Sequence, residues 1–338
     1  MKTDLVKINS KNKNSVLVRA ADLIKKGELV AFPTETVYGL GANAFDENAV
    51  KKIFVAKGRP NDNPLIVHIS DLKQLNELVE CVPPKAKQLM KKFWPGPLTI
   101  VMKKSAKVPM CITGGLNTVA VRMPSSKIAL ELIKKSGFPL AAPSANSSTK
   151  PSPTMAKHVL EDLNEKIPLI IDGGNCDIGV ESTVIGLAGE KPILFRPGKV
   201  TLEELTKVLG GIDSAKPISA TNSTPQSPGM KYMHYAPKAY LILVESKLGK
   251  NDFSTEVATL SLNENPDLIG VISFSKKVGF ENEFFFNKDI DLYAKELFSA
   301  LRELDSRGVK KIIVEGIIDT NFGLAVMNRL RKAASKII

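Results

Sequence analysis

The sequence contains few of the residues that build metal centres, disulfides and covalent intermediates. Among its 338 residues are 3 Cys, 3 His and 1 Trp. Cys81, Cys111 and Cys176 are odd in number and widely spaced, which argues against a disulfide framework and favours a reducing compartment. The histidines show no zinc-ligand spacing. We therefore expect no metal held by side chains alone, and we expect the cysteines to be buried without a chemical role.

Long apolar runs are also missing. No stretch of about 18 uncharged apolar residues occurs, so we expect no transmembrane helix. The first residues, MKTDL, lack the apolar run of a signal peptide, which predicts a cytoplasmic protein without membrane contact. A hydrophobic content of 43% is enough for well-packed cores, and the length favours two domains over one.

Several common catalytic motifs are absent. The chain has no G-x-x-x-x-G-K-[ST] phosphate loop, and GLGANA at residues 39–44 does not complete a dinucleotide-binding fingerprint. Ser144 and Ser182 lack the G-x-S-x-G context of a hydrolase nucleophile. The sequence therefore argues against P-loop, dinucleotide-dependent and serine-hydrolase chemistry.

Positive charge is unevenly distributed. The chain has 47 Lys+Arg against 35 Asp+Glu, a net charge of +12. Residues 239–338 hold 14 of each sign, so the whole excess lies in residues 1–238. Such an imbalance favours polyanionic ligands, either a nucleotide or a nucleic acid. The plain alternative is a charge that only serves solubility.

The pattern of apolar segments predicts an α/β catalytic domain in residues 1–210. Short apolar runs typical of buried strands alternate with amphipathic stretches typical of helices. The expected strands lie at 28–32, 65–69, 98–103, 118–123, 169–171 and 192–196. Because residues 37–42 follow the first strand and contain two glycines, we expect them to form a ligand-binding loop.

A change of composition divides the chain. Residues 211–238 are rich in Ser, Thr, Pro and Gly and lack apolar periodicity, which predicts a linker. Its segment SPGMKYMHYAP at 227–237 is aromatic enough to serve as a lid, the alternative being that the rings pack on a domain surface. Strands and helices alternate again in residues 239–338, which predicts a small open α/β domain. No catalytic motif occurs there.

The strongest local signal is KGRPNDNP at residues 57–64. Lys57 and Arg59 flank a glycine, and two prolines enclose Asn-Asp-Asn. Glycine lets the backbone approach a ligand closely, and each proline restricts the chain and removes a donor. Such a segment can direct Lys57, Arg59 and Asn63 at one phosphate or carboxylate. The alternative interpretation is a solvated turn between a helix and a strand.

Other polar side chains follow or end apolar runs, where open α/β folds place their ligands. With the three residues above, they are Thr36, Arg122, Ser144, Asn146, Ser182 and Arg196. These cations, hydroxyls and amides together suit a ligand that carries phosphates and a carboxylate. Such a site acts by positioning and charge stabilisation, without a covalent nucleophile. His68, inside an apolar strand, is by itself better explained as a hydrogen-bonded core residue.

Six motifs in a single order resemble a known family. They are PTETVYGLG at 33–41, KGRPNDNPLIVHI at 57–69, FWPGPLT at 93–99, APSAN at 142–146, ESTVI at 181–185 and RPG at 196–198. Over residues 15–210 they resemble the YrdC-like threonylcarbamoyl-AMP synthases. The linker motif and the domain after it resemble the long two-domain form of that family. The resemblance implies a twisted mixed sheet with helices and a concave basic surface, followed by a smaller, Rossmann-like α/β domain.

The resemblance also implies a reaction and a site. L-threonine, bicarbonate and ATP would give L-threonylcarbamoyladenylate and pyrophosphate, and a downstream tRNA threonylcarbamoyl-transferase machinery would use the product. Magnesium would arrive with ATP. The threonine site would comprise Thr36, His68, Arg122, Ala142 and Ser182. The ATP site would comprise Arg59, Asn63, Thr118, Ser144, Asn146, Ser152 and Arg196, with Lys57 at the phosphates and Tyr235 closing over the nucleotide. Lys57 and Arg59 are the expected catalytic residues.

Two alternatives stay open. A non-catalytic module that binds double-stranded RNA or tRNA would explain the basic part of the chain. It leaves Arg122, Ser182 and His68 unexplained, because binding an RNA backbone needs no carboxylate pocket. A carbamoyl-transfer domain of a hydrogenase-maturation factor would share the core, but the chain lacks the zinc-finger cysteines and the acylphosphatase segment that such proteins have.

Overall fold

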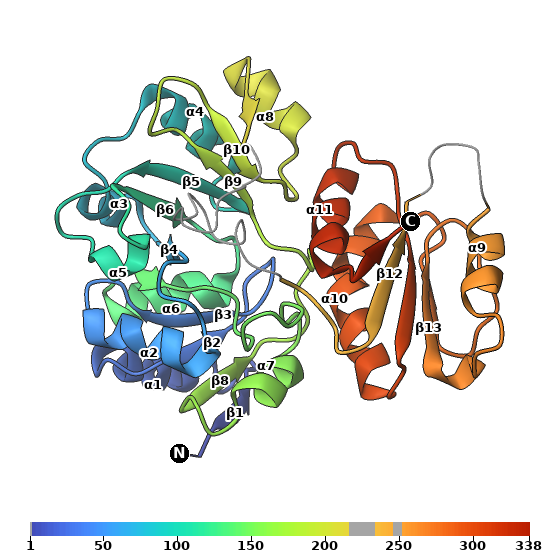
Figure 1. The fold of residues 1–338 in the computed structure, drawn as a ribbon. Helices are drawn as coiled ribbons and strands as arrows, with labels where there is room; N and C mark the ends of the chain where they lie inside the picture. Colours follow the sequence, from blue (N-terminus) through green and yellow to red (C-terminus); the bar gives the residue numbers. More distant parts are fainter. Residues whose placement is uncertain (1, 216–233, 246–251) are drawn as a thin grey trace.

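Two sheets form the centres of two domains. The computed structural model describes residues 2–215, 234–245 and 252–338. Within these ranges an 11-stranded sheet and a 5-stranded sheet lie side by side, each with its own helices (Figure 1). Most of the predicted linker, residues 216–233, lies outside the described residues.

The larger sheet is built from the first part of the chain. Its strands are β1 (Asp4–Lys7), β2 (Val30–Phe32), β3 (Gly39–Asn43), β4 (Ile66–His68), β5 (Leu98–Lys103), β6 (Thr118–Arg122), β7 (Leu140–Ala141), β8 (Leu169–Asp172), β9 (Thr183–Gly186), β10 (Ile193–Arg196) and β11 (Asp213–Ser214). They lie in the order β1-β8-β2-β3-β7-β4-β6-β5-β9-β10-β11. The pairs β4/β6 and β5/β9 are parallel, whereas β2/β3 and β5/β6 are antiparallel. The predicted mixed sheet is confirmed.

Helices cover both faces of this sheet. They are α1 (Lys13–Lys25), α2 (Glu47–Lys57), α3 (Leu72–Leu78), α4 (Pro84–Phe93), α5 (Met110–Thr113), α6 (Lys127–Ser136), α7 (Ala156–Leu163) and α8 (Leu202–Leu209). Side chains of a strand alternate between the faces of its sheet. Val30 and Phe32 accordingly pack in one core with α1 and α6, whereas Ala31 belongs to the larger core with α2, α3 and α4.

The segment after β2 differs from its prediction. Residues 39–43 form strand β3 against β2 instead of the expected ligand-binding loop. A Cβ atom on Gly41 would lie 2.7 Å from the Phe32 ring, so glycine is required here for packing between strands. The prediction of a loop over residues 37–42 is therefore wrong for β3, and the turn between the strands is confined to residues 33–38.

Local sequence features determine where the helix before the KGRPNDNP segment starts and ends. The Asp46 side chain accepts hydrogen bonds from the backbone N–H groups of Asn48 and Ala49, which caps the start of α2. Gly58 follows the last turn with φ of 62°, in the left-handed conformation that ends many helices. Lys57 is therefore the last helical residue, and Arg59 begins the loop.

The smaller sheet is parallel throughout. Its strands are β12 (Tyr240–Val244), β13 (Ile269–Ser273), β14 (Glu283–Phe285), β15 (Lys311–Glu315) and β16 (Lys336–Ile337), in the order β14-β13-β15-β12-β16. Its helices are α9 (Phe253–Leu260), the short 3₁₀ helix Pro266–Leu268, α10 (Ile290–Ser306) and α11 (Gly323–Ala333). The helices α10 and α11 lie between this sheet and the larger domain, and α9 covers the opposite face (Figure 1). This arrangement confirms the predicted open α/β fold.

Some residues lie elsewhere than expected. Asp213 and Ser214, expected in the linker, form the edge strand β11 against β10. Cys176 is buried, but Cys111 is only partly buried and Cys81 is exposed, so the prediction of burial is wrong for Cys81. No helix within the described ranges has the length and apolar composition that a membrane crossing requires.

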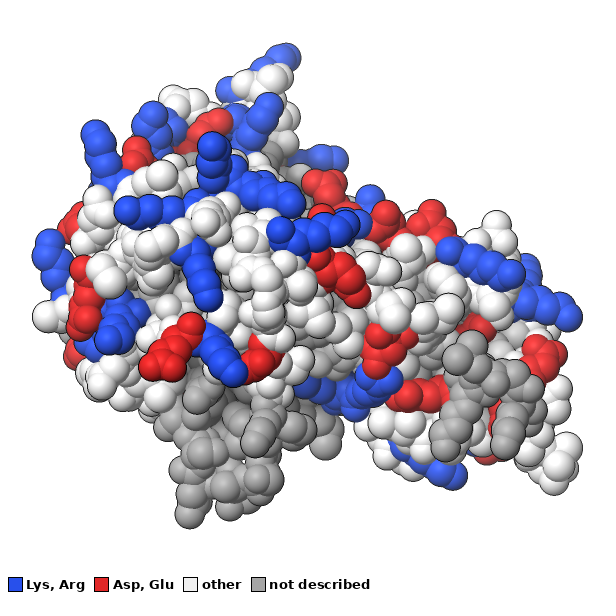
Figure 2. Space-filling model, turned by 90° about the horizontal axis from the view of Figure 1, so that it is seen from above, with Lys and Arg blue, Asp and Glu red and all other residues white. Residues whose placement is uncertain are grey.

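Basic side chains are a visible feature of the larger domain. Seen from above, many Lys and Arg side chains are spread over the broad lobe with some Asp and Glu among them, and both signs also appear on the smaller lobe (Figure 2). This agrees with the sequence, in which residues 239–338 carry no net charge.

Candidate active site

Strand ends converge at one place in the larger domain. β4 and β6 run parallel with His68 opposite Arg122, and β5 places Thr99 opposite Arg122 on the other side. β9 begins directly after Ser182, whose Oγ lies 2.8 Å from Thr99 Oγ1. The adjoining strands thus bring His68, Arg122 and Ser182 together, as expected for ligand sites at strand ends.

A partly open cavity lies at this place, lined by polar and apolar side chains from several strand ends and loops. All but two of the predicted site residues line it. They are Thr36, Lys57, Arg59, His68, Arg122, Ala142, Ser144, Asn146, Ser152, Ser182, Arg196 and Tyr235. The lining also includes Tyr38, Lys150, Glu181 and His234, which the sequence analysis did not single out.

Asn63 and Thr118 are the two exceptions. Asn63 is buried, and its Oδ1 has no hydrogen-bond partner within the described part of the chain. Thr118 begins β6, at the opposite end of the strand from Arg122. Neither residue lines the cavity, so the structure does not bring them together with the other predicted residues.

The KGRPNDNP segment contributes two cations to the lining of the cavity. The ammonium of Lys57 donates to the carbonyl oxygens of Ser144 and Asn146, both at 2.5 Å, and to Asn146 Oδ1 at 3.2 Å. Since an ammonium has three donors, these bonds occupy all of them. Arg59 lines the cavity and also binds carbonyl oxygens of its own loop. Lys57 and Arg59 thus line the cavity without Asn63, and Lys57 binds the loop at 144–146.

Arg122 is the centre of one end of the cavity. Its Nη2 donates to Glu35 Oε1 at 2.6 Å, and its Nη1 donates to Thr36 Oγ1 at 2.8 Å. Its Nε donates to the carbonyl of Gly96 at 3.3 Å. Arg122 is 3% exposed, and Glu35 is 7% exposed. A guanidinium held in this way has a fixed orientation towards any carboxylate in the cavity.

His68 lies beside this pair without adding charge to it. Its ring is buried, and its Nδ1 has no hydrogen-bond partner among the residues described. Burial, together with the positive charge of Arg122, lowers the pKa of His68 to about 3. The imidazole is therefore neutral at pH 7, so Arg122 and Glu35 carry the formal charge at this end.

A second buried carboxylate, Glu181, organises the other side of the cavity. Its Oε1 accepts a 2.5 Å hydrogen bond from Ser152 Oγ, and its Oε2 accepts one of 2.9 Å from Arg329 Nε. Burial alone would raise the pKa of Glu181, but Arg329 and Arg196 outweigh it and lower the pKa to about 2. Arg196 in turn donates to the carbonyl of Ser182 at 3.0 Å and to its Oγ at 3.2 Å. The carboxylate therefore joins Ser152 of the cavity wall to Arg329 of α11.

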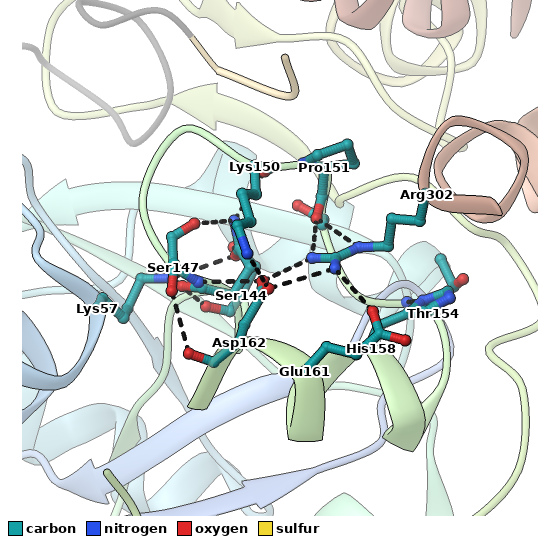
Figure 3. Close-up of polar contacts among 12 residues, drawn as sticks. Lys57, Ser144, Ser147, Lys150, Pro151, Thr154, His158, Glu161, Asp162 and Arg302 are labelled. Atoms are coloured by element: carbon teal, nitrogen blue, oxygen red, sulfur yellow. Dashed lines mark hydrogen bonds and ion pairs between the residues drawn. The ribbon is translucent and has the colours of Figure 1, made fainter. Parts of the chain in front are cut away.

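Two arginines of the smaller domain reach these loops. Arg329 of α11 has no exposed surface, and besides Glu181 it binds the carbonyl of Pro197 at 2.6 Å. Arg302 of α10 donates to Asp162 Oδ2 at 2.7 Å and to the carbonyl of Pro151 at 2.6 Å (Figure 3). Both belong to a region without motifs, so the sequence offered no signal for them.

Asp162 binds both Arg302 and residues of the cavity wall. Its carboxylate also accepts hydrogen bonds from the backbone N–H of Ser147 at 3.2 Å and from Lys150 Nζ at 2.8 Å (Figure 3). Burial would raise the pKa of Asp162, yet Arg302 and Lys150 lower it below its ordinary value. The carboxylate is thus ionised at neutral pH and joins α10 to the loop at 144–152.

A glycine lies at a close contact between the domains. Gly179 has φ of 83°, and its N–H donates to the carbonyl of Thr36 at 3.1 Å. A Cβ atom at this position would lie 2.3 Å from Lys295 Cα in α10. The backbone near Thr36 therefore packs directly on the helix that carries Arg302.

Tyr235 joins the cavity from the end of the predicted linker. Its ring lies 5.1 Å from that of Phe298 in a stacked arrangement, and the next backbone N–H, of Ala236, donates to the carbonyl of Thr149. Burial raises the pKa of Tyr235 to about 12. Residues 227–233 of the predicted lid lie outside the described residues.

Family models and relatives agree with this geometry. The Sua5/YciO/YrdC model, described as "Telomere recombination", matches residues 22–198, and the model "Threonylcarbamoyl-AMP synthase, C-terminal domain" matches residues 200–335. The threonylcarbamoyl-AMP synthase of Pyrococcus abyssi is 53% identical over 93% of each chain. The chain belongs to the threonylcarbamoyl-AMP synthase family. The synthase of Bacillus subtilis is 48% identical over 94% of this chain and 92% of its own.

Solved structures extend the likeness to the arrangement of domains. A crystal structure of P. abyssi Sua5 in complex with L-threonine matches with a TM-score of 0.93 at 48% identity, over 99% of both chains. Several shorter relatives cover about half to three fifths of the chain. A relative from Mycobacterium tuberculosis is 37% identical over 59% of this chain and 91% of its own. The two-domain form of the family is therefore the one to which this chain corresponds.

Proposed function

We propose that the protein synthesises L-threonylcarbamoyladenylate from L-threonine, bicarbonate and ATP and releases pyrophosphate. The observation that carries the proposal is Arg122, a buried and oriented guanidinium in a cavity that Arg59 and Arg196 also line. One cation suits a carboxylate, and the others suit phosphates. The family and the P. abyssi structure with L-threonine support the same function.

The end of the cavity around Arg122 takes the amino acid. Arg122 binds the α-carboxylate through its guanidinium. Thr36, His68, Ala142 and Ser182 surround the rest of the substrate, because all four line the cavity near this end. His68, being neutral, offers a hydrogen-bonding nitrogen without repelling the substrate ammonium.

The nucleotide occupies the remainder of the cavity. The residues assigned to it are Arg59, Ser144, Asn146, Ser152, Arg196 and Tyr235, all of which line the cavity. Lys57 supports this part indirectly, through the loop that contains Ser144 and Asn146. Asn63 and Thr118 are left out of the assignment because they do not line the cavity. Magnesium belongs to the substrate, bound to the phosphates of ATP.

The reaction requires two bonds to form in sequence. The ammonium of threonine first releases a proton to the solvent, the resulting amine attacks the carbon of bicarbonate, and loss of water gives the carbamate. A carbamate oxygen then attacks the α-phosphorus, and the bond to pyrophosphate breaks. Arg59 and Arg196 stabilise the negative charge that develops on the phosphates, which is how such sites accelerate phosphoryl and nucleotidyl transfer.

The product determines the setting of the protein. A mixed anhydride of this kind is hydrolytically reactive, so we propose that a tRNA threonylcarbamoyl-transferase machinery consumes it. Direct contact with tRNA would draw on the basic surface of the larger domain. Both ATP and tRNA are cytoplasmic, and we propose the same location for the protein.

The test is pyrophosphate release from MgATP and bicarbonate, with and without L-threonine. Release that requires threonine, with serine and glycine as comparison substrates, supports the synthase. Arg59→Ala should abolish turnover without loss of fold, whereas Arg307→Ala, an exposed arginine paired with Glu303, should not change it. Absence of threonine-dependent release, together with salt-sensitive RNA binding, would instead favour the non-catalytic RNA-binding module.

A further inference from the structure

Glu35 forms an ion pair with the arginine that receives the substrate carboxylate. The contact is 2.6 Å long, and the two side chains are 7% and 4% exposed. A carboxylate so close to this guanidinium competes with the carboxylate of the substrate. Its presence therefore calls for a physical reason.

The backbone N–H groups of Glu35 itself and of Ser125 lie near the carboxylate and help to lower its pKa, after the larger contribution of Arg122. The carbonyl of Glu35 accepts a 2.9 Å hydrogen bond from the N–H of Ile178, a contact that any residue at position 35 can make. Glu35 lines a second, open cavity and does not line the main one, whereas Thr34 lines both. Of the two carboxylate oxygens of Glu35, Oε2 is buried and without a hydrogen-bond partner in the described part of the chain. Such an oxygen is costly to bury, so the pair with Arg122 must compensate for it.

The donors of Arg122 explain what the pair achieves. A guanidinium has five N–H groups, one on Nε and two on each terminal nitrogen. Gly96, Thr36 and Glu35 take one from each nitrogen. One N–H on each terminal nitrogen is left, which is the number that a two-pronged contact with a carboxylate uses.

The charges at the end of the cavity around Arg122 also support a role for Glu35 in substrate binding. Glu35 is ionised, because although burial raises its pKa, Arg122 lowers it further, and His68 is neutral. The end of the cavity around Arg122 is therefore neutral before substrate binds. A neutral site that presents both signs suits a zwitterion, whereas an isolated arginine would favour any carboxylate.

We propose that Glu35 is a positioning and specificity residue for the amino-acid substrate. It holds Arg122 so that two N–H groups face the substrate carboxylate, and it cancels the arginine charge so that a zwitterion is preferred over a simple carboxylate anion. The inference rests on the proposed function, because it takes Arg122 as the carboxylate site.

The experiment uses the full-length protein and the variant Glu35→Gln. Glutamine keeps the length of the side chain and an oxygen for Arg122 but removes the charge. Threonine binding is measured by calorimetry, together with binding of the analogue 2,3-dihydroxybutanoate, in which a hydroxyl replaces the ammonium. We expect the Kd for threonine to rise about tenfold and that for the analogue to fall, while the KM for ATP changes less than about twofold.

Two further variants keep the result interpretable. Glu35→Asp retains the charge on a shorter side chain, so it should weaken threonine binding and still reject the analogue, even if Glu35→Gln does not fold. Glu245→Gln applies the same chemical change to an ion pair with Arg331 in the smaller domain and should leave all three constants unchanged.

The outcomes separate this inference from the proposed function. Wild-type protein that neither binds threonine nor releases pyrophosphate would overturn the proposed function itself. Wild-type protein that does both, with the same threonine-to-analogue preference in Glu35→Gln and Glu35→Asp as in wild type, would overturn only the role of Glu35.

Discussion

The two sheets share an α/β architecture but use their strand ends differently. In the larger sheet, side chains at strand ends, such as His68 and Arg122, face a cavity. In the smaller sheet, the loop after β13 is filled by the protein's own carboxylates. Glu315 accepts hydrogen bonds from the N–H groups of residues 274 and 275, and Glu283 from those of residues 278 and 279. Backbone donors that could bind an anion are thereby consumed.

The smaller domain instead contacts residues next to the cavity through side chains of its helices. Arg329 and Arg302 leave α11 and α10 and end at Glu181 and Asp162 of the larger domain. Both carboxylates also bind residues of the cavity wall. The comparison teaches that a domain whose described strand ends bind its own carboxylates can still contact the wall of its neighbour's site through its helices.

The largest expected effect comes from Arg329→Met. Removing the arginine leaves Glu181 as a buried, poorly compensated charge, so the free energy of unfolding should fall by about 3–5 kcal/mol and the KM for ATP should rise. Denaturant unfolding and steady-state kinetics measure the two effects. Arg331→Met is the control, because its ion pairs are partly exposed and should matter by about 1 kcal/mol or less. Equal effects of the two variants would contradict a special role for Arg329.

Acid should weaken the larger domain first. All three histidines, His68, His158 and His234, precede residue 239, and burial lowers the pKa of each to about 3. Between pH 3 and 6.5 the unfolded chain therefore binds more protons, and stability falls as the pH falls. From pH 6.5 to 5.5 the loss should be about 1 kcal/mol per histidine.

Unfolding at a series of pH values measures this loss, and His158→Gln should remove about one third of it. His158 accepts a hydrogen bond from the N–H of Thr154 and does not line the cavity, so its replacement tests stability apart from ligand binding. A slope that is unchanged in this variant would mean that other groups dominate the acid response.

Arg302→Met should have a smaller effect than Arg329→Met. Asp162 keeps Lys150 and the N–H of Ser147 as partners, so we expect a loss of about 1–3 kcal/mol in unfolding free energy. Because Asp162 supports the loop at 144–152, the KM for ATP should rise while that for threonine stays constant. Arg307→Met, which removes an exposed pair with Glu303, serves as the control. A change in the KM for threonine alone would contradict the proposed effect of Arg302, through Asp162, on the loop at 144–152.

The smallest effect is expected from Glu315→Gln. The amide keeps one oxygen acceptor for the loop after β13, so stability should fall by about 1 kcal/mol. Turnover should be unchanged, because these bonds do not reach the cavity. A loss of activity in this variant, with the fold intact, would show that the smaller domain acts through its strand ends after all.

The sequence predicts which functional groups form the site better than it predicts which residues these groups contact. Apolar runs of three to six residues locate most strands, such as β5 and β15, because burial dictates their composition. Polar residues next to these runs, such as Arg122 and Ser182, reach the cavity because strand ends are adjacent in the sheet. These features depend on local pattern and on a general rule of the fold.

Features that depend on tertiary packing could not be predicted. The segment KGRPNDNP shows that an ammonium and an amide are present at Lys57 and Asn63. The direction of the Lys57 ammonium depends on the position of the loop at 144–146, which the segment itself does not reveal. The glycines of β3 resemble a flexible loop until the Phe32 ring is placed against Gly41. Arg302 and Arg329 resemble ordinary helix surface residues, since nothing in their own helices indicates a second domain next to them.

The packing of Gly179 restricts which residue can occupy this position. Its backbone lies against α10, where even a methyl group would collide with Lys295. In a shorter relative that ends before such a helix, this restriction would be lifted and only the left-handed backbone would remain, which asparagine also tolerates. Relatives without the second domain should therefore tolerate asparagine at this position, whereas two-domain relatives should require glycine.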